Sequence, residues 1–504
     1  MSGKVGHVDP GAILSYAEYV TDDPNHTITA GTMATWIANS ARFVRRPYAW
    51  HIFEDGATTY ALNCRTQTID SSNADPNVVF DYVFDNCSSG DSIFVENGDY
   101  DFDDTATLAT AGGVHFVHIV GESKGARIKP PSGKFAFQIG DPNHVNSYCE
   151  RLIIEGLMFW PQSSGFGSGV QLDFCFQPLV IDCDFKDCAT GLQVSFSSKA
   201  KFVRCRFEEF TTKGLYFKTS AQGLVTDQYV FQSFFESTVD NSKGMVVEYN
   251  VNGILIDGCL YSGTGVNPAL EITASYSGIW ISNTVFDTIG DAALASNGIE
   301  ILGSADNGCT DIQFSNVWIQ SCWGHGLYMK GQTTAANRVS NAQFANCLFG
   351  NNHKTGVYLE NVETIQFDNC RFMNNGLADT AADYEMAQLL INDYSAHLLF
   401  DNCTFVGAGG LSNEQYVVIV DADNDSSITA KFSDCFLSHE TDQAKAYIAY
   451  EKSDAAPETI YLYAHDTYSR NSGNAGEVII QMGANAAEQA QNVDCKNGTD
   501  GWWL

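Results

Sequence analysis

The sequence predicts an all-β fold, a single-stranded right-handed parallel β-helix in which short strands stack coil upon coil. Three observations predict it: a motif of Asn or Asp, then Cys, any residue and Phe recurs along the chain; apolar and polar residues alternate around it; and glycine is abundant, at 44 residues. Alternation with a period of two is typical of strands. A unit this short cannot bury its apolar side alone, so it must stack on copies of itself. We expect about eleven coils.

The motif occurs in six clear copies and five weaker ones, separated by 22 to 33 residues. The clear copies contain Cys183, Cys205, Cys347, Cys370, Cys403 and Cys435. Because strand side chains alternate between faces, these cysteines and the aromatic or aliphatic residues two positions later should point inward. The count of 15 cysteines is odd, and no CxxC pair joins neighbouring copies. We interpret these thiols as small core residues, reduced as in a cytoplasm, and not as metal ligands.

A second strand follows each motif, in most coils after a glycine. Its outward position through eight coils reads Gln193, Tyr216, Val246, Glu271, Glu300, Tyr328, Tyr358 and Leu390. In-register parallel strands lie ~4.8 Å apart, so Glu271 and Glu300 should be neighbours and the two tyrosines should follow. Carboxylates beside flat aromatic faces suit sugar rings, which offer hydroxyls and C–H groups. We interpret Glu271, Glu300, Tyr328 and Tyr358 as a candidate glycan-binding site; ordinary solvated acidic surface is the alternative.

The outward column of the motif strand contains an apolar strip. The column reads Leu157, Asp184, Arg206, Phe234, Cys259, Val285, Trp318, Leu348, Arg371, Thr404 and Phe436. An exposed apolar strip on a charged protein indicates cover by another subunit. We expect Phe234, Val285, Trp318 and Leu348 to form a subunit interface in a homotrimer; a local loop folded over the strip is the alternative.

The two ends of the chain differ from the repeat. A capping helix is predicted near 75–88, with Asp75 as N-cap, Pro76 in the first turn, and Val78, Val79, Tyr82 and Val83 on one face. Residues 1–50 are expected to be an attachment segment, with a helix at 31–43 and a basic group at Arg42, Arg45 and Arg46 that could dock on an acidic partner. The β-helix should span 51–440. Residues 441–504 should form a β-rich end whose apolar terminus, Trp502 to Leu504, docks.

The charge balance is strongly acidic: 27 Lys and Arg stand against 60 Asp and Glu, a formal net charge of −33. Such a surface repels nucleic acid and anionic membranes, so neither is an expected partner. Scattered carboxylates keep a protein hydrated in molar salt, where the Debye length is ~3 Å; this favours a salt-loving source. The first residues lack a basic start followed by an apolar run, and no apolar stretch reaches the ~18 residues of a membrane span. We therefore expect no signal peptide and no membrane insertion.

Residues 51–102, HIFEDGATTYALNC through SIFVENGDYDF, resemble the opening module of pectate-lyase-like β-helix proteins. The resemblance extends over roughly residues 50–440. In this part the chain is similar to virus tailspikes and tail fibres, and most of all to β-helix proteins of haloarchaea and of viruses that infect archaea. The resemblance implies a virion surface protein (tail fibre, spike or capsid turret) made in the host cytoplasm. It further implies a homotrimer, attachment to other virion proteins through residues 1–50, and binding of a host surface glycan or S-layer glycoprotein. The fold serves several functions, so a polysaccharide depolymerase, either a lyase or a glycoside hydrolase, is the alternative.

Catalytic signatures of related enzymes are incomplete in this sequence, which favours a protein that is not an enzyme. The calcium-binding carboxylate cluster and basic residue implied for lyases have no match. Gly324-His325-Gly326 matches one motif of polygalacturonase-like hydrolases, but its partner motifs are missing. For the alternative function the candidate catalytic residues are therefore Glu271, Glu300 and His325. The two carboxyls would suit retaining hydrolysis if ~5–5.5 Å apart, whereas a glycine-flanked His more often reflects the backbone.

One candidate metal site lies late in the chain. Asp421, Asp423 and Asp425 have the 1-3-5 spacing of a calcium loop, but Ser426 and Phe432 replace its Gly and Glu. A hydrated turn is the expected reading. We expect no cofactor; structural Ca²⁺, Na⁺ or K⁺ ions are the ligands that the sequence leaves open.

Overall fold

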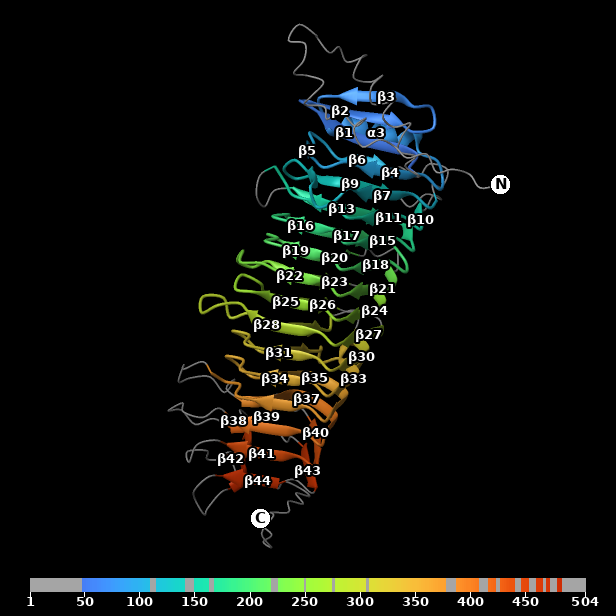
Figure 1. Cartoon of the computed structure of the whole chain (residues 1–504). Helices are drawn as coiled ribbons and strands as arrows, with labels where there is room; N and C mark the ends of the chain where they lie inside the picture. The colour runs from blue at the N-terminus through green and yellow to red at the C-terminus, as the bar shows by residue number, and fades with distance from the viewer. Residues whose placement is uncertain are drawn as a thin grey trace, which may run out of the picture.

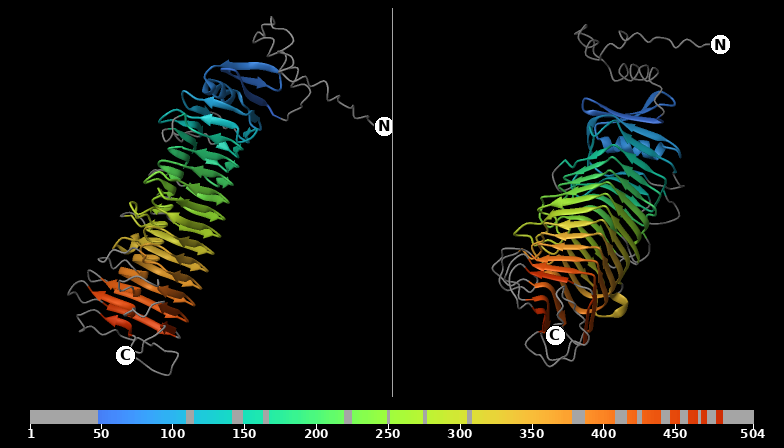
Figure 2. Two further views of the ribbon diagram at one scale, coloured as in Figure 1. Left: turned by 60° about the vertical axis from the view of Figure 1, so that its left-hand side comes forward. Right: turned by 60° about the horizontal axis from the view of Figure 1, so that its bottom comes forward.

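The computed structural model of the chain forms an elongated column of stacked coils, with the N-terminal cap at one end (Figures 1 and 2). The structure describes the following residues: 48–108, 115–140, 149–162, 167–218, 225–248, 251–273, 277–304, 308–377, 387–407, 416–422, 427–439, 446–452, 459–465, 468–471 and 478–482. The helix predicted at 31–43, the basic group at Arg42, Arg45 and Arg46, and the apolar C-terminus lie outside the described residues.

Each coil contributes a strand to three parallel sheets, which we call sheets 1, 2 and 3 in the order in which the chain enters them. Sheet 1 contains β4 (Ser92–Val95), β7 (His118–Gly121), β11 (Ile153–Glu155), β15 (Leu179–Ile181), β18 (Lys201–Val203), β21 (Val225–Phe231), β24 (Val251–Asp257), β27 (Ser277–Ser282), β30 (Cys309–Ser315), β33 (Val339–Ala345), the second parts of β35 (Val357–Asp368) and β37 (Ala387–Asp401), β40 (Ser427–Ser433) and β43 (Thr459–His465). Sheet 2 contains β5 (Gly98–Asp101), β8 (Ala126–Lys129), β12 (Met158–Phe159), β16 (Asp184–Lys186), β19 (Arg206–Glu208), β22 (Phe234–Glu236), β25 (Leu260–Gly263), β28 (Val285–Ile289), β31 (Trp318–Gln320), β34 (Leu348–Gly350), β36 (Arg371–Met373), β38 (Thr404–Gly407), β41 (Phe436–His439) and β44 (Tyr468–Asn471). Sheet 3 contains β6 (Ala106–Leu108), β9 (Phe135–Gly140), β13 (Ser168–Asp173), β17 (Thr190–Ser195), β20 (Lys213–Lys218), β23 (Lys243–Val247), β26 (Leu270–Thr273), β29 (Ile299–Leu302), β32 (Leu327–Lys330), the first parts of β35 and β37, β39 (Tyr416–Ala422), β42 (Ala446–Lys452) and β45 (Val478–Met482).

The expected fold class, an all-β parallel solenoid, is confirmed by this pairing. Sheet 2 has 14 strands, three more than the eleven coils expected. The additional strands are β5, β8 and β44, whose sequences lack the cysteine of the motif. At one corner the short strands β10 (Cys149–Glu150) and β14 (Cys175–Phe176) also pair. The parallel pairing continues to Met482 through β42–β45, into the residues 441–504 for which we expected a β-rich end.

The motif marks the turn from sheet 1 to sheet 2. Its Asn or Asp adopts a left-handed backbone, with φ of 53° at Asp182 and 51° at Asn402, a conformation that Asn, Asp and Gly accept more readily than other residues. Gly156 and Gly258 occupy the same position with φ of 68° and 66°. The outward column expected from the sequence contains Leu157 and Cys259 in these two coils, one residue before the outward position in the structure. The outward residues there are Met158 and Leu260, whereas Leu157 and Cys259 are buried.

The inward positions form ladders through the core. Aromatic rings at the Phe position stack nearly parallel from Phe159 to Phe286, with centroid separations of 5.0 Å for Phe159–Phe185 and 4.7 Å for Phe207–Phe235. The motif cysteines are buried. In five of the six clear copies the thiol reaches a carbonyl oxygen of the preceding coil, as in Cys205 Sγ to Val180 O at 3.5 Å, whereas Cys347 Sγ reaches Ala345 O of its own coil. The interpretation of these cysteines as core residues is confirmed.

The N-terminal cap consists of helix α3 (Pro76–Asn86) and the antiparallel strands β1 (Trp50–Asp55), β2 (Thr58–Asn63) and β3 (Thr68–Asn73). Asp75 is the N-cap, and its carboxylate accepts a hydrogen bond from Asn77 N at 3.1 Å. Val79, Phe80, Val83 and Phe84 face the core. Val78, which we placed on that face, is 42% exposed and Tyr82 only partly buried, because the buried stripe runs through positions three and four apart. β1 pairs with β4, so the cap extends sheet 1.

Candidate functional site

The predicted column of sheet 3 is in register in the structure. Glu271 pairs with Glu300, Glu300 with Tyr328, and Tyr328 with Tyr358. We call these four residues the glutamate–tyrosine surface. It is less exposed than an outward column suggests: Tyr358 is 8% exposed, and with Leu390 and Ile419 it belongs to a small hydrophobic cluster outside the solenoid. The surface therefore changes from carboxylates at β26 and β29 to apolar contacts at β35.

The two glutamates lie in different environments. Glu271 forms an ion pair with Lys243 of the preceding coil. Glu300 accepts a hydrogen bond from Asn297 Nδ2 at 2.8 Å. Burial raises the pKa of Glu300; the bond from Asn297 opposes this shift, and the charge of Glu271 adds to it. The arrangement thus places an ion-paired carboxylate beside one that retains its proton to higher pH.

The rings of Tyr328 and Tyr358 stack on each other. Their ring centroids lie 4.8 Å apart at an interplanar angle of 23°. The Tyr358 hydroxyl donates to Glu360 Oε2 at 2.7 Å and accepts from Asn392 Nδ2 at 2.9 Å, and burial raises the pKa of this tyrosine. Glu360 is held in turn by Lys330 Nζ at 2.7 Å. The orientation of the Tyr358 ring is therefore fixed by Glu360 and Asn392, which lie in the neighbouring outward column of sheet 3.

His325 lies beside the tyrosines, with its ring centroid 5.6 Å from that of Tyr328 and 5.1 Å from that of Tyr358. Burial, with a smaller contribution from Lys354, lowers the pKa of His325 to about 3, so the imidazole is neutral at physiological pH. A Cβ at Gly326 would lie 2.6 Å from Gly356 O. The close approach of neighbouring coils accounts for this flanking glycine.

Several polar residues around the surface were not anticipated. They are Lys213, Lys243, Asn297, Lys330, Glu360, Trp323 and His353. The Trp323 and His353 rings stack with centroids 3.6 Å apart at 15°. Lys213 and Lys243 pair in register. Each is followed by a glycine of its sheet 3 strand, Gly214 or Gly244. This repeated Lys-Gly pair is a signal by which sequence analysis could have found the two lysines.

The predicted interface strip lies on the outward face of sheet 2. Phe234, Leu260, Val285, Trp318 and Leu348 pair in order from β22 to β34. Trp318 is 52% exposed and Leu260 is 39% exposed, while the other three are partly buried. Correcting the register at Leu260 makes the strip continuous over five strands.

The predicted carboxylate cluster near residue 421 falls mainly outside the described residues. Asp421 belongs to β39, where its backbone pairs with that of Asn392. Asp423 and Asp425 are not described, so the cluster itself stays a prediction. Within the described ranges, no group of three His, Cys, Asp or Glu residues is arranged to hold a metal ion. No helix in the described part of the chain is long and apolar enough to cross a membrane.

The comparisons with known proteins agree with the fold. A family model described as a right-handed β-helix region matches residues 223–405 and 297–439. The chain therefore carries a right-handed parallel β-helix, which defines its structural class and confirms the predicted handedness. No curated protein sequence matches the chain.

Solved structures that align with this chain include two classes of protein. One is the catalytic domain of a GH87 α-1,3-glucanase in complex with nigerose, with 10% identity and a TM-score of 0.44 over 81% of this chain and 64% of that chain. The other class is phage tailspikes. Tailspike protein 3 of Bacteriophage CBA120 has 14% identity and a TM-score of 0.42 over 85% of this chain and 69% of that chain. Tailspike gp49 of Pseudomonas phage LKA1 has 10% identity and a TM-score of 0.47 over 80% of this chain and 77% of that chain. The chain thus spans less than two thirds of the glucanase domain.

Proposed function

We propose that this chain is a virion surface protein, a tail fibre, spike or capsid turret, that binds a host cell-surface glycan or glycoprotein through the glutamate–tyrosine surface. The observation that carries the proposal is the in-register neighbourhood of two carboxylates and two stacked tyrosine rings, of which Tyr358 is hydrogen-bonded. A sugar ring needs an apolar surface for its C–H groups and acceptors for its hydroxyls. Tyr328, which is partly exposed, offers the first, and Glu271 and Glu300 offer the second.

Binding by this surface would need little rearrangement. Glu300 is oriented by Asn297, and Tyr358 by Glu360 and Asn392. Side chains held by such partners lose less conformational entropy when a ligand binds. This preorganisation favours a recognition surface over a set of freely solvated acids.

The test is binding of envelope polysaccharide and surface glycoprotein extracted from the host, measured by co-sedimentation in molar salt. The variants are Glu271→Gln with Glu300→Gln, and Tyr328→Ala. We expect each to weaken binding about tenfold or more, which corresponds to ~1.4 kcal/mol. Glu208→Gln on sheet 2 is the matched acidic control. Unchanged binding in both variants would remove the glutamate–tyrosine surface from the proposal.

A polysaccharide depolymerase is the second candidate, favoured by the contrast between Glu271 and Glu300. A carboxyl with a raised pKa beside an ion-paired one resembles the arrangement by which glycosidases divide acid and nucleophile roles. Incubation with the same polysaccharide, followed by assays for reducing ends and for unsaturated sugars, distinguishes the candidates. New reducing ends that disappear in Glu300→Gln would favour a hydrolase. Unsaturated products would favour a lyase, and binding without product would favour the attachment protein.

The remaining parts of the proposal concern assembly and source. The sheet 2 strip, with Trp318 at 52% exposure, would be covered in a homotrimer, and residues 1–50 would attach to other virion proteins. The net charge of −33 suits a virus of halophilic archaea. Light scattering of the full chain in molar salt tests the assembly: we expect a trimer that Trp318→Asp dissociates. A monomeric wild-type protein would contradict it.

A further inference from the structure

Trp280 stands out on a face of the solenoid that the proposed function does not use. It lies in β27 on the outward side of sheet 1 and is 41% exposed. A Cβ built on Gly278, whose φ is 77°, would lie 2.9 Å from Trp280 Cη2 and 3.3 Å from Cζ3. The benzene edge of the indole therefore lies close to the bare backbone of this glycine, while much of the ring stays accessible to solvent. Any side chain at Gly278 would displace it.

A row of neutral side chains continues from Trp280 in both directions. Trp280 pairs with Gln313, Gln313 with Gln343, and Gln343 with Gln366. On the other side it pairs with Leu255. Gln313 and Gln343 are exposed and Gln366 is partly buried. The described residues offer none of these three amides a side-chain hydrogen-bond partner, so each presents a free donor and acceptor at intervals of ~4.8 Å.

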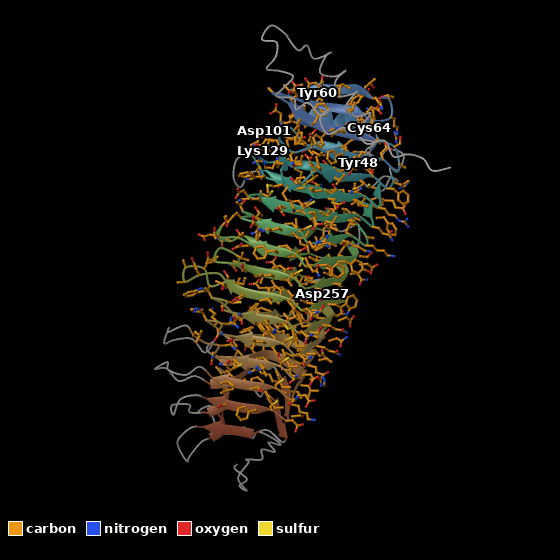
Figure 3. All side chains as sticks on the ribbon, viewed as in Figure 1. Tyr48, Tyr60, Cys64, Asp101, Lys129 and Asp257 are labelled. Atoms are coloured by element: carbon orange, nitrogen blue, oxygen red, sulfur yellow. The ribbon has the colours of Figure 1, made fainter. Side chains whose placement is uncertain are left out.

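The charge around this row restricts the ligand. Residues 244–329 contain no Lys or Arg. The charged side chains on the two strands beside Trp280 are acids, Asp257 in β24 and the exposed Asp311 in β30; Asp257 is visible on this side of the column in Figure 3. An anionic polymer would be repelled here. The apolar part of the row is Tyr229, Leu255 and Trp280, and a protein interface would need a larger apolar centre than these three side chains provide.

We propose that Trp280 with Gln313, Gln343 and Gln366 forms a second carbohydrate-binding site, specific for a neutral glycan chain. One sugar stacks on the exposed face of Trp280, and the following sugars exchange hydrogen bonds with the row of amides. The chain of the glycan runs along the axis of the solenoid, across successive coils. This site lies on a different sheet from the glutamate–tyrosine surface and does not depend on it.

The test is affinity electrophoresis of the full-length protein in native gels containing dextran, galactomannan or soluble starch, with polygalacturonate as the anionic polymer. We expect at least one neutral polymer to retard the protein and polygalacturonate to have no effect. Trp280→Ala should weaken retardation about tenfold or more, because stacking area and polar contacts are lost together. Gln343→Ala should weaken it about threefold, as expected for one neutral hydrogen bond.

Two controls separate this site from others. Phe436→Ala removes an aromatic ring of similar exposure (36%) from sheet 2 and should leave retardation unchanged. The double variant Glu271→Gln, Glu300→Gln should also leave it unchanged, which distinguishes this site from the proposed function. Absence of retardation by every neutral polymer overturns the proposal, as does an equal loss in Trp280→Ala and Phe436→Ala. A change in oligomeric mass caused by Trp280→Ala would instead identify this face as a contact between copies and would also overturn it.

Discussion

Residues 124–243 and residues 244–440 share one coil geometry but differ in surface charge. The first region contains 13 Lys and Arg against 12 Asp and Glu, and the second contains 5 against 22. Their formal charges are therefore +1 and −17. Both regions have the same inward ladders of cysteine and aromatic residues. The difference teaches that the inward positions specify this fold while the outward positions vary independently.

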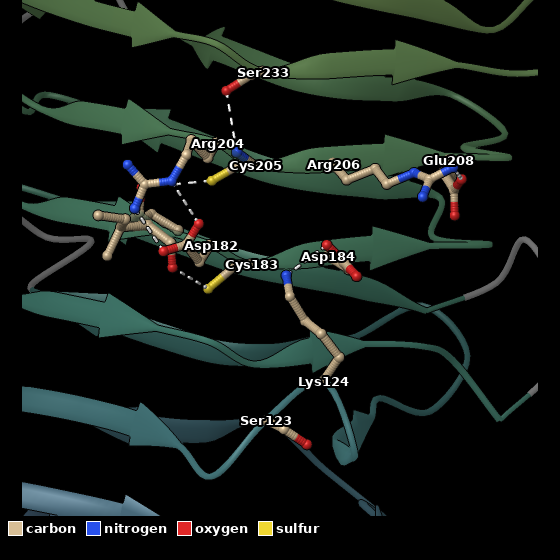
Figure 4. A network of polar contacts seen from close by, with 12 residues as sticks. Ser123, Lys124, Asp182, Cys183, Asp184, Arg204, Cys205, Arg206, Glu208 and Ser233 are labelled. Carbon is tan, nitrogen blue, oxygen red and sulfur yellow. Dashed lines mark hydrogen bonds and ion pairs between the residues drawn. The ribbon is translucent and has the colours of Figure 1, made fainter.

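In the first region, cations and carboxylates pair between coils. Arg204 donates from Nε to Asp182 Oδ1 at 2.8 Å and from Nη2 to Oδ2 at 2.7 Å. Lys124 Nζ lies 2.6 Å from Asp184 Oδ1, and Figure 4 shows both pairs in one view. Arg204 holds the pKa of Asp182 below its usual range. These pairs are exposed, so each contributes little, and their main effect is to balance charge.

The second region contains a ladder of uncharged partners at the turn from sheet 2 to sheet 3. Asn352 Nδ2 donates to Asn375 Oδ1 at 2.8 Å, and Asn375 Nδ2 donates to Gln388 Oε1 at 2.8 Å. All three side chains are buried. Cys188 occupies the corresponding turn of the first region, where its thiol reaches Phe159 O at 3.5 Å. A continuous amide ladder thus replaces a thiol inside the acidic region.

The shared core leads to the largest expected effect. Phe207→Ala in the first region and Phe367→Ala in the second should each cost roughly 3–5 kcal/mol of local stability, because each removes a fully buried, stacked ring. Native-state hydrogen exchange of the flanking strands measures both costs. Costs that differ by more than about 2 kcal/mol would show that the two regions differ in their cores as well.

The turn ladder should separate the regions at an intermediate scale. Asn375→Ala removes the side-chain bonds that link Asn352 to Gln388 and leaves Asn352 Nδ2 only its longer bond to Ile319 O at 3.4 Å, so we expect a loss of roughly 1–3 kcal/mol. Cys188→Ala removes one weak donor and a small volume and should cost about 1 kcal/mol. Thermal unfolding of the two variants compares them. If Cys188→Ala lost more stability than Asn375→Ala, the amide ladder would not be the more stabilising of the two turn structures.

The sequence was sufficient for the inward ladders and for the glutamate–tyrosine column, because alternation along a strand fixes which residues share a face. Two coils were misaligned because Gly156 and Gly258 occupy the left-handed position of the motif. Glycine has no side chain, so it does not reveal whether the next residue points inward or outward. The burial of Val246 and Leu390 could not be foreseen either. Alternation shows that a residue points outward, whereas neighbouring side chains and loops decide whether it is exposed.

The partners of the site residues were missed for a related reason. Asn297 reaches Glu300 from three residues earlier, before the strand begins, and Lys330 contacts Glu360 across coils that are 30 residues apart in sequence. The antiparallel strands of the cap do not repeat, so the solenoid pattern gave no information about them. Repetition thus predicts the core, and single coils determine the chemistry.

Salt should affect the two regions differently. In the second region, 22 carboxylates face few cations, and raising the salt concentration from 0.1 M to 1 M shortens the screening length from ~10 Å to ~3 Å. We expect amide exchange in β24–β40 to slow roughly tenfold, equivalent to ~1.4 kcal/mol, while strands β15–β20 change little. Equal slowing in both regions would assign the effect to general salting-out and not to carboxylate repulsion.

The smallest effect concerns Glu300 and Glu271 at the boundary of the two regions. Burial raises the pKa of Glu300 above its ordinary value near 4.5, so the folded protein holds this proton to higher pH than the unfolded chain does. Stability therefore falls as the pH rises through the interval between the two pKa values, and the loss is complete above the folded value. Glu300→Gln removes this loss while Asn297 keeps an acceptor.

Thermal unfolding from pH 4 to pH 8 measures the consequence. We expect Glu300→Gln to match the wild type near pH 4 and to exceed it at pH 7 by about 1 kcal/mol or less. Glu271→Gln is the matched control: it leaves Lys243, the last cation before an acidic stretch of the chain, without its ion pair. That variant should be less stable than the wild type at pH 7. Shifts of the same sign in both variants would mean that the two glutamates share one environment, and the depolymerase alternative would then lose the contrast on which it rests.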